Sequence, residues 1–269
     1  MNDPGDFFKF GLLRALQAGT PESTVGIVWY RTDSRMSPPK QDHRRYLHVG
    51  VYRDIDSELH ATLKAIEDQI SAGTDRCLSL VERSDILRNA TYHDELVPGG
   101  AAGVDRSEWL QRAVRALQGT DIIFADPDTG IASPSMEETR SFGSQHASLR
   151  EIAALADVAR TLVFYQHRNR QPWDTQRRAL LERMADVRPG AAISSVLISS
   201  HGGRAFFCVS QDEHGHKLVE RGLSVFRERI ADLALNGRGH VTLHPLHEAQ
   251  ADDAPRQHAT DDAPSEEMR

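Results

Sequence analysis

Two carboxylates flank a proline directly after an apolar run, in Asp126-Pro127-Asp128. The preceding residues, 121–125, are typical of a buried strand, and Pro127 has no N–H to donate and fixes the turn that leaves it. We therefore expect both carboxylates at the end of a strand. There they can accept hydrogen bonds from an amine or bind a divalent cation such as Mg²⁺ or Mn²⁺. The alternative is a turn in which Asp128 bonds to its own backbone.

Polar residues end two other apolar runs in the same way. Tyr165 and His167 close the run at 161–165, where His167 suits a general base and Tyr165 can stack on a planar group; a polar cap of the next loop is the alternative. Glu82 closes the run Cys77–Glu82, which we interpret as a strand. An acid at that place can accept both hydroxyls of a ribose, and a surface salt bridge is the alternative.

The chain alternates helical patterns with short apolar runs. Helices are expected at about 7–18, 56–71, 105–117, 149–159, 174–186 and 218–233, and strands at 25–30, 77–82, 121–125, 161–165, 193–199, 205–210 and 241–243. Strands separated by helices predict a mostly parallel sheet, and Gly202 and Gly203 predict a C-terminal antiparallel hairpin. The predicted fold is α/β: one Rossmann-like, doubly wound domain over residues 1–246. Ligands of such folds lie outside the carboxyl ends of the strands, where these polar residues fall.

Composition sets broad limits on the protein. Its 269 residues are 39% hydrophobic and 26% charged, which is typical of a globular protein. We find neither a run long enough to span a bilayer nor a secretory signal. Cys77 and Cys208 each lie in an apolar run, which argues against a disulfide framework or a cysteine zinc site. We therefore expect a cytoplasmic protein without a membrane partner.

The formal charge of −7 is unevenly distributed. Residues 247–269 carry seven acidic and two basic side chains without apolar periodicity, which predicts a disordered acidic tail. Residues 1–246 are then close to neutral, so the net charge does not exclude a nucleic acid as partner.

Several segments, in the same order, resemble the large-subunit ribosomal-RNA adenine-N6 methyltransferases, which are S-adenosylmethionine enzymes with a Rossmann-like, methyltransferase-type fold. Gly5–Phe10 is similar to the family's Gly-Asn-x-Ala-Asp-x-x-Lys-His helix. Leu80–Ser84 is similar to its second core strand with the acid that ends it, and Asp126–Thr129 to its catalytic Asp-Pro-Pro-Tyr. Tyr165 ends the next strand in both, and Gly202–Val209 resembles the family's late turn and strand.

The resemblance implies a cofactor site and an acceptor site. Lys9 and Glu82 would hold S-adenosylmethionine, and Asp126 would hold the target amine of a nucleic acid or nucleotide-like substrate. Asp33, close to the place of the acid after the family's first strand, and Ser84, in the polar stretch after Glu82, join the expected cofactor site.

The sequence departs from the family at two places, and two other hypotheses stay open. Residues 29–35 contain no glycine where the family has a glycine loop, while Asp128 and Thr129 replace its second proline and its tyrosine. The first alternative is a metal-dependent hydrolase or transferase on phosphorylated or nucleotide substrates, with Asp126 and Asp128 binding Mg²⁺ or Mn²⁺. The second is a non-catalytic subunit that binds a protein partner or a nucleic acid.

Overall fold

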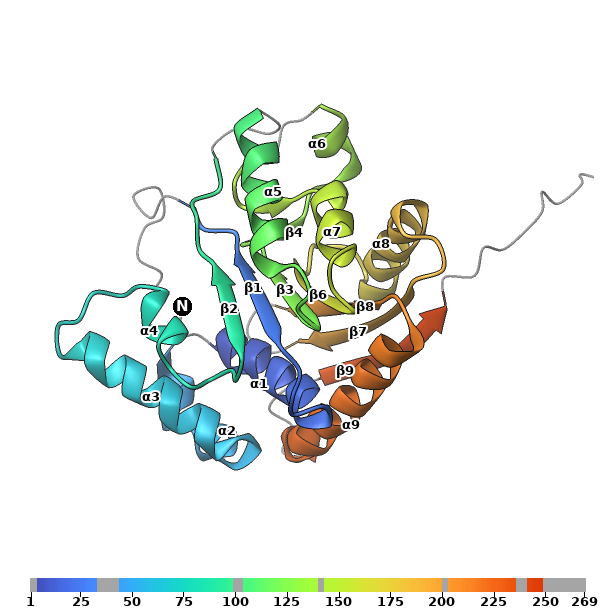
Figure 1. The fold of residues 1–269 in the computed structure, drawn as a ribbon. Coiled ribbons are helices and arrows are strands. Elements are labelled where there is room, and N and C mark those ends of the chain that lie inside the picture. Colours follow the sequence, from blue (N-terminus) through green and yellow to red (C-terminus); the bar gives the residue numbers. More distant parts are fainter. Residues whose placement is uncertain are drawn as a thin grey trace, which may run out of the picture.

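A seven-stranded sheet with helices on both faces forms the core of the protein (Figure 1). The structure, a computed structural model, describes residues 4–32, 44–98, 104–139, 143–199, 203–235 and 241–248. Across the sheet the strands lie in the order β2 (Ala90–His93), β1 (Val25–Trp29), β3 (Ile122–Asp126), β6 (Thr161–His167), β8 (Arg204–Ser210), β7 (Ala192–Ile198) and β9 (Val241–Glu248).

Strand directions confirm the expected α/β class and the mostly parallel sheet. β2, β1, β3 and β6 are parallel to one another. β8 is antiparallel to both of its neighbours, β6 and β7, so β7 runs in the common direction again, and β9 is antiparallel at the edge. The antiparallel pairing of β7 with β8 was predicted; residues 200–202, which connect them, lie outside the described residues.

Two apolar clusters, one on each face, hold the helices to the sheet because successive strand residues face opposite ways. Ile27 belongs to the first cluster and its neighbour Val28 to the second. The first face carries α1 (Pro4–Gly19), η2 (Arg44–His48), α2 (Gly50–Ile55), α3 (Ser57–Ser71), α4 (Ser79–Glu82) and α9 (Glu213–Leu235). The second carries α5 (Val104–Leu117), α7 (Leu149–Ala156) and α8 (Trp173–Val187). The connection after β3 contains β4 (Gly130–Ile131), α6 (Pro134–Glu138) and β5 (His146–Ala147).

Helix α1 is buried on almost every side, as expected for a helix whose apolar residues do not form a single stripe. It packs on the first face of the sheet, beside α9 and α3. At Gly222 of α9 a Cβ atom would lie 2.6 Å from the Cα atom of Leu16, so only glycine allows this close approach of the two helices. Any polar side chain on α1 therefore needs a partner inside the protein.

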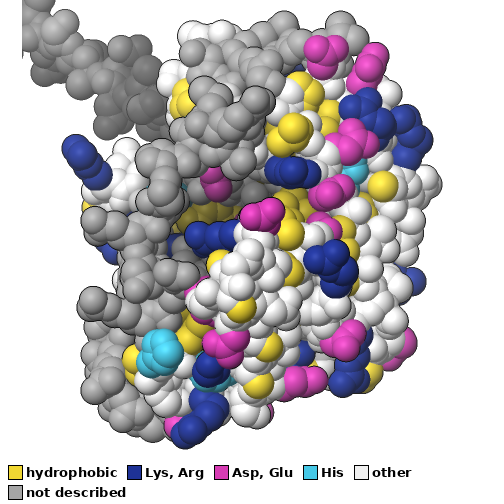
Figure 2. All heavy atoms as spheres, turned by 90° about the vertical axis from the view of Figure 1, so that its left-hand side faces the viewer, with side chains coloured by type: hydrophobic (Ala, Val, Ile, Leu, Met, Phe, Trp, Pro, Cys, Tyr) yellow, Lys and Arg dark blue, Asp and Glu magenta, His cyan; other side chains and the backbone are white. Residues whose placement is uncertain are grey.

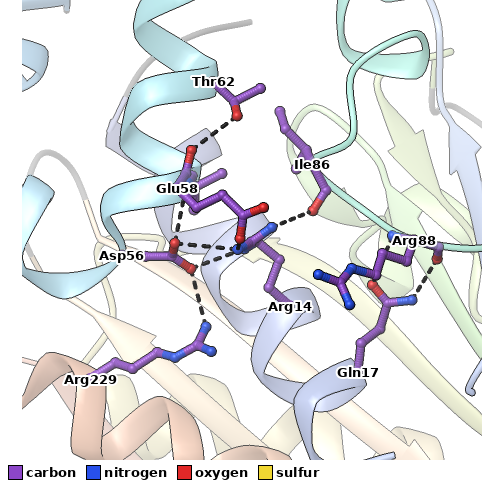
Figure 3. A network of polar contacts seen from close by, with 9 residues as sticks. Arg14, Gln17, Asp56, Glu58, Thr62, Ile86, Arg88 and Arg229 are labelled. Carbon is purple, nitrogen blue, oxygen red and sulfur yellow. Dashed lines mark hydrogen bonds and ion pairs between the residues drawn. The ribbon is translucent and has the colours of Figure 1, made fainter. Parts of the chain in front are cut away.

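Asp56 links three helices of the first face (Figure 3). Its Oδ1 atom accepts a hydrogen bond from the backbone N–H of Leu59 at 2.9 Å, which caps the start of α3. Its Oδ2 atom accepts from Nε of Arg14 on α1 at 3.0 Å and from Nη1 of Arg229 on α9 at 3.1 Å. With 7% of its side chain exposed, Asp56 forms a nearly buried ionic contact among α1, α3 and α9.

The predicted strand Cys77–Glu82 is wrong. This segment forms a turn followed by the short helix α4, and its Leu80 and Val81 pack into the first cluster. The strand beside β1 is instead β2, which ends at His93. A short apolar run does not distinguish a helix from a strand by periodicity, and the four residues of β2 lie at the sheet edge with mostly accessible side chains. β2 therefore carries little hydrophobic pattern.

The C-terminal strand is longer than predicted. We expected 241–243, but β9 continues to Glu248 and so passes the expected domain boundary at residue 246. Its pairing with β7 shifts register between His244 and His247, which places Pro245 at the irregularity of an edge strand, where a missing N–H is tolerated. Proline thus hid the strand from the sequence pattern.

Two predictions fall outside the described residues. These are Asp33 and the acidic tail beyond residue 248. Within the described part of the chain, no helix has the length and hydropathy needed to cross a membrane.

Replacing Asp56 by alanine is expected to lower the free energy of unfolding by about 3 kcal/mol, because the change removes the cap of α3 and leaves two arginines without their shared carboxylate. Urea denaturation measures this loss. Asp68→Ala is the matched control: it removes the exposed i,i+4 pair with Lys64 and is expected to cost less than about 0.5 kcal/mol. Equal stability of the two variants would contradict the prediction.

The two cysteines are expected to differ in reactivity. Cys77 is exposed, whereas Cys208 is buried in β8, and burial raises the pKa of its thiol to about 12. A thiol reagent at pH 8 should therefore label Cys77 rapidly and leave Cys208 unmodified until the protein is denatured. Mass spectrometry of native and denatured samples checks this, and fast labelling of Cys208 in the native protein would show that β8 is accessible.

Candidate functional site

The strand order reverses between β1 and β3. From β1 the chain continues to β2 on one side, and then returns to β3 on the other side. In open α/β sheets the carboxyl ends of the strands at such a reversal form the usual ligand crevice. Trp29 and Asp126 are register partners at this point, so they lie side by side at the carboxyl ends of β1 and β3.

The ammonium of Lys9 connects α1 to this point of the sheet. Its Nζ atom lies 2.7 Å from Oδ2 of Asp126 and 2.8 Å from Oδ1 of Asp6. Only 10% of the Lys9 side chain and 19% of the Asp126 side chain are exposed. Three aromatic rings lie within reach of the ammonium, with centroids at 5.3 Å for Trp29, 5.5 Å for Phe10 and 5.9 Å for Phe124.

Burial and charge act on this pair in opposite directions. Burial opposes the charged form of Lys9, but the carboxylates of Asp126 and Asp6 outweigh it and raise the pKa of the ammonium. For Asp126, burial itself raises the pKa, although the charge and hydrogen bond of Lys9 oppose that shift. The ammonium therefore stays protonated, and Asp126 is a carboxylate held in surroundings that are poor in water.

Glu82 reaches the site although it is not at a strand end. Located on helix α4, its Oε1 atom accepts a hydrogen bond from Nε1 of Trp29 at 3.0 Å. Burial raises the pKa of Glu82, and the Trp29 N–H partly opposes the shift. Trp29 thus donates its N–H to Glu82, and its ring lies near the ammonium of Lys9. Two predicted cofactor residues, Lys9 and Glu82, are therefore neighbours of the same tryptophan.

Tyr92 of β2 completes this side of the site. Its ring stacks on Trp29 with centroids 6.3 Å apart and an interplanar angle of 10°. Its hydroxyl is buried and has no hydrogen-bond partner among the described residues, and burial next to Glu82 raises its pKa to about 12. A buried hydroxyl without a partner favours an additional polar group at this place.

Ser84 and Asp33 do not join the cluster in what the structure describes. The Ser84 hydroxyl donates to the carbonyl of Val81 at 2.6 Å and closes the turn after α4. Asp33 lies outside the described residues, so its predicted role stays a prediction.

After β1, where the methyltransferases described above have a glycine loop, this chain has Tyr30. Its side chain is buried on the opposite face of the sheet, where the hydroxyl lies 3.3 Å from Oε2 of Glu151. Glu151 in turn forms a buried ion pair with Arg106 at 2.6 Å. The strand end is fixed by this network, and Arg31 extends the parallel pairing because its carbonyl accepts from the N–H of Val97 at 2.9 Å.

The segment after Asp126 is held in place from β6. Gly130 has a φ of 102°, and a Cβ atom there would lie 2.6 Å from Oε1 of Gln166. The same Oε1 atom accepts from the N–H of Ile131 at 2.8 Å, while the N–H of His167 donates to the carbonyl of Thr129. The loop that carries Asp126 is therefore fixed on both sides of a glycine that no other residue replaces without strain.

The two carboxylates of the Asp-Pro-Asp motif lie in different surroundings. Asp126 is mostly buried on Lys9, whereas Asp128 is exposed. Among the described residues, no backbone N–H donates to Asp128 in the turn that was the alternative interpretation. Within the described ranges, no three His, Cys, Asp or Glu side chains lie close enough together to hold a metal ion. The Mg²⁺ or Mn²⁺ hypothesis for Asp126 and Asp128 stays a prediction.

Tyr165 and His167 form a pair at the end of β6. The Tyr165 hydroxyl lies 2.9 Å from Nδ1 of His167, and burial raises the pKa of Tyr165 to about 12. The positive charge of Arg204, the first residue of β8, opposes the rise of the Tyr165 pKa, and its side chain lies across Gly5, where a Cβ atom would overlap the guanidinium group. Tyr165 also feels the charges of Asp126 and Lys9, so it lies on the same face as that pair.

Sequence reasoning missed four residues of this cluster: Asp6 as a partner of Lys9, Trp29, Tyr92 and Arg204. The Asp6–Lys9 spacing of i,i+3 on a helix was a usable signal. The other three become neighbours only through strand pairing.

On the side of the molecule where α1 begins, Figure 2 shows a hollow with hydrophobic side chains at its floor and both basic and acidic side chains beside it.

Gly130→Ala is expected to destabilise the protein by about 1–3 kcal/mol more than Gly119→Ala. Both glycines have positive φ, at 102° and 84°, so both variants carry backbone strain, but only at Gly130 does the new methyl group meet Gln166. Chemical denaturation of the two variants measures the difference. Equal losses would show that Gln166 moves aside and does not fix the loop.

Comparisons with known proteins find similarity among solved structures and none among family models or curated proteins. A scan against protein-family models finds no match, and a search of the curated proteins finds none either. Among solved structures, this chain is similar to the crystal structure of protein LPL1258 from Legionella pneumophila str. Philadelphia 1, described with family model DUF519. The two are 10% identical, the match covers 91% of this chain and 98% of that chain, and the TM-score is 0.45.

Proposed function

We propose that the protein is a methyltransferase-fold enzyme that uses S-adenosylmethionine and methylates an amino group of a nucleic acid or nucleotide-like substrate. The observation that carries this proposal is the Asp126 carboxylate at the sheet reversal, held by Lys9 through Oδ2 and partly open to solvent. No described residue donates to its Oδ1 atom, so this oxygen can accept an N–H from a substrate.

The side chains around Trp29 fit the proposed cofactor in three respects. Glu82 binds Trp29 through Oε1 and leaves Oε2 for a ribose hydroxyl. The buried Tyr92 hydroxyl lacks a partner among the described residues. The Lys9 ammonium, held against the Trp29 ring, shows that a cation is stable beside Asp126. When bound, S-adenosylmethionine would supply an activated methyl group on a positively charged sulfur.

The acceptor side is formed by Asp126 and Tyr165. Asp126 would accept a hydrogen bond from the target amine and orient its lone pair toward the methyl group; the excess proton then leaves the methylated nitrogen for solvent. Tyr165, whose hydroxyl is held by His167, would form a wall against a planar base.

The next loop supports an acceptor that carries phosphate. Arg168 and Arg170 follow His167, are exposed, and form no ion pair with a described residue. Exposed guanidinium groups of this kind suit phosphate groups.

Calorimetric titration with S-adenosylmethionine tests the proposal. We expect the wild type to bind the cofactor and Asp126→Asn to lose most of its methyl transfer, because Asp126 is assigned to the acceptor. Transfer of a labelled methyl group to RNA or DNA should fall by about 10²–10³-fold in the variant. Asp68→Asn, at an exposed carboxylate of α3 outside the site, is the matched control and should retain transfer. Absence of binding by the wild type at millimolar ligand would contradict the proposal.

A further inference from the structure

The surroundings of the Lys9 ammonium are those of a binding site for a cation. Two carboxylate oxygens lie at 2.7 and 2.8 Å, from Asp126 and Asp6. The rings of Trp29, Phe10 and Phe124 lie at 5.3–5.9 Å. Aromatic rings at this distance attract ammonium and other organic cations, and the attraction is stronger when water is excluded. We call these five side chains the cation enclosure.

The cation in the enclosure belongs to a side chain that can move. Lys9 reaches the enclosure through four methylene groups. Asp126, one of the five side chains of the enclosure, has 19% of its side chain exposed. Asp128 follows Asp126 by two residues and is exposed, so it offers a displaced ammonium another partner near solvent. If another cation replaces the Lys9 ammonium, Asp126 and Asp6 neutralise that cation, and Asp128 is available to the displaced ammonium.

We propose that the cation enclosure is a binding site for an organic cation and that the Lys9 ammonium is its placeholder in the ligand-free protein. For the identity of the cation this rests on the proposed function: the sulfonium of S-adenosylmethionine takes the place of the ammonium, and Lys9 turns toward Asp128. Lys9 thus competes with the cofactor's charge, in contrast to the cofactor-holding role that the sequence predicted.

The first test fills the enclosure without any cofactor. Lys9→Ala removes three methylene groups and the ammonium, which together correspond to n-propylammonium, whereas Lys9→Met removes the charge and keeps most of the volume. We expect n-propylammonium at ten times its Kd to raise the Tm of Lys9→Ala by about 2–4 °C over NaCl of equal ionic strength. Lys9→Met and the exposed-site control Lys64→Ala should not respond, and n-propanol should have no effect.

A missing shift in Lys9→Ala overturns the cation site. If Lys9→Ala does not fold alone, the yield of refolding with n-propylammonium or with Na⁺ replaces the Tm, and equal yields overturn the site in the same way. Because no cofactor is present, this result is independent of the proposed function.

The second test follows Lys9 itself in the wild type. The chain has four lysines, at positions 9, 40, 64 and 217, so acetylation of each is resolved by mass spectrometry. Lys9 should react slowly in the free protein, and several-fold faster with saturating S-adenosylmethionine, because the sulfonium displaces it. S-Adenosylhomocysteine, which lacks the positive charge, should leave its rate unchanged, and Lys64 and Lys217 serve as internal controls.

The outcomes separate the two proposals. Protection of Lys9 by both ligands would show that it holds a part common to them, and would overturn the placeholder role. An unchanged rate with bound S-adenosylmethionine would overturn it too. If neither ligand binds the wild type, the proposed function fails, and the Tm of Lys9→Ala with n-propylammonium still decides whether the enclosure binds an organic cation.

Discussion

A buried ammonium fixes the arrangement of the candidate site. Helix α1 is buried on almost every side against the sheet, α3 and α9, so the ammonium of Lys9 needs counter-charges within the protein. Its partners Asp6 and Asp126 make the burial tolerable, and the same contact places the Asp126 carboxylate at the reversal of the sheet. One ion pair therefore attaches the first helix to β3 and determines which carboxylate oxygen is left for a ligand.

The sequence was informative wherever a strand is buried on both faces. β1, β3, β6, β7 and β8 are buried along almost their whole length and consist mostly of apolar residues, and each was predicted within a few residues. The edges were not predictable in this way. β2 has a half-exposed pattern and β9 contains Pro245, while Cys77–Glu82 imitated a strand with Leu80 and Val81 that serve a short helix. Burial on one face leaves too few apolar positions for a reliable period.

The candidate site divides along the same line. The rule that ligands lie at the carboxyl ends of strands found Asp126, Tyr165 and His167, and the resemblance added Lys9 and Glu82, which the structure brings to the same region. It did not find the contacts between them. That Lys9 binds Asp126, and that Trp29 bridges Glu82 and Lys9, depends on strand register and on the position of α1, neither of which a local pattern encodes.

The packing of α1 against α9 joins two helices that the ribosome makes at very different times. The apolar surface of α1 is made early relative to its partner: its cover at Gly222 and its ionic link through Arg229 come from a helix more than two hundred residues later. Contacts this distant in sequence form slowly and leave hydrophobic surface exposed meanwhile. In a nascent chain of this protein, α1 therefore lacks its cover until α9 has left the ribosome.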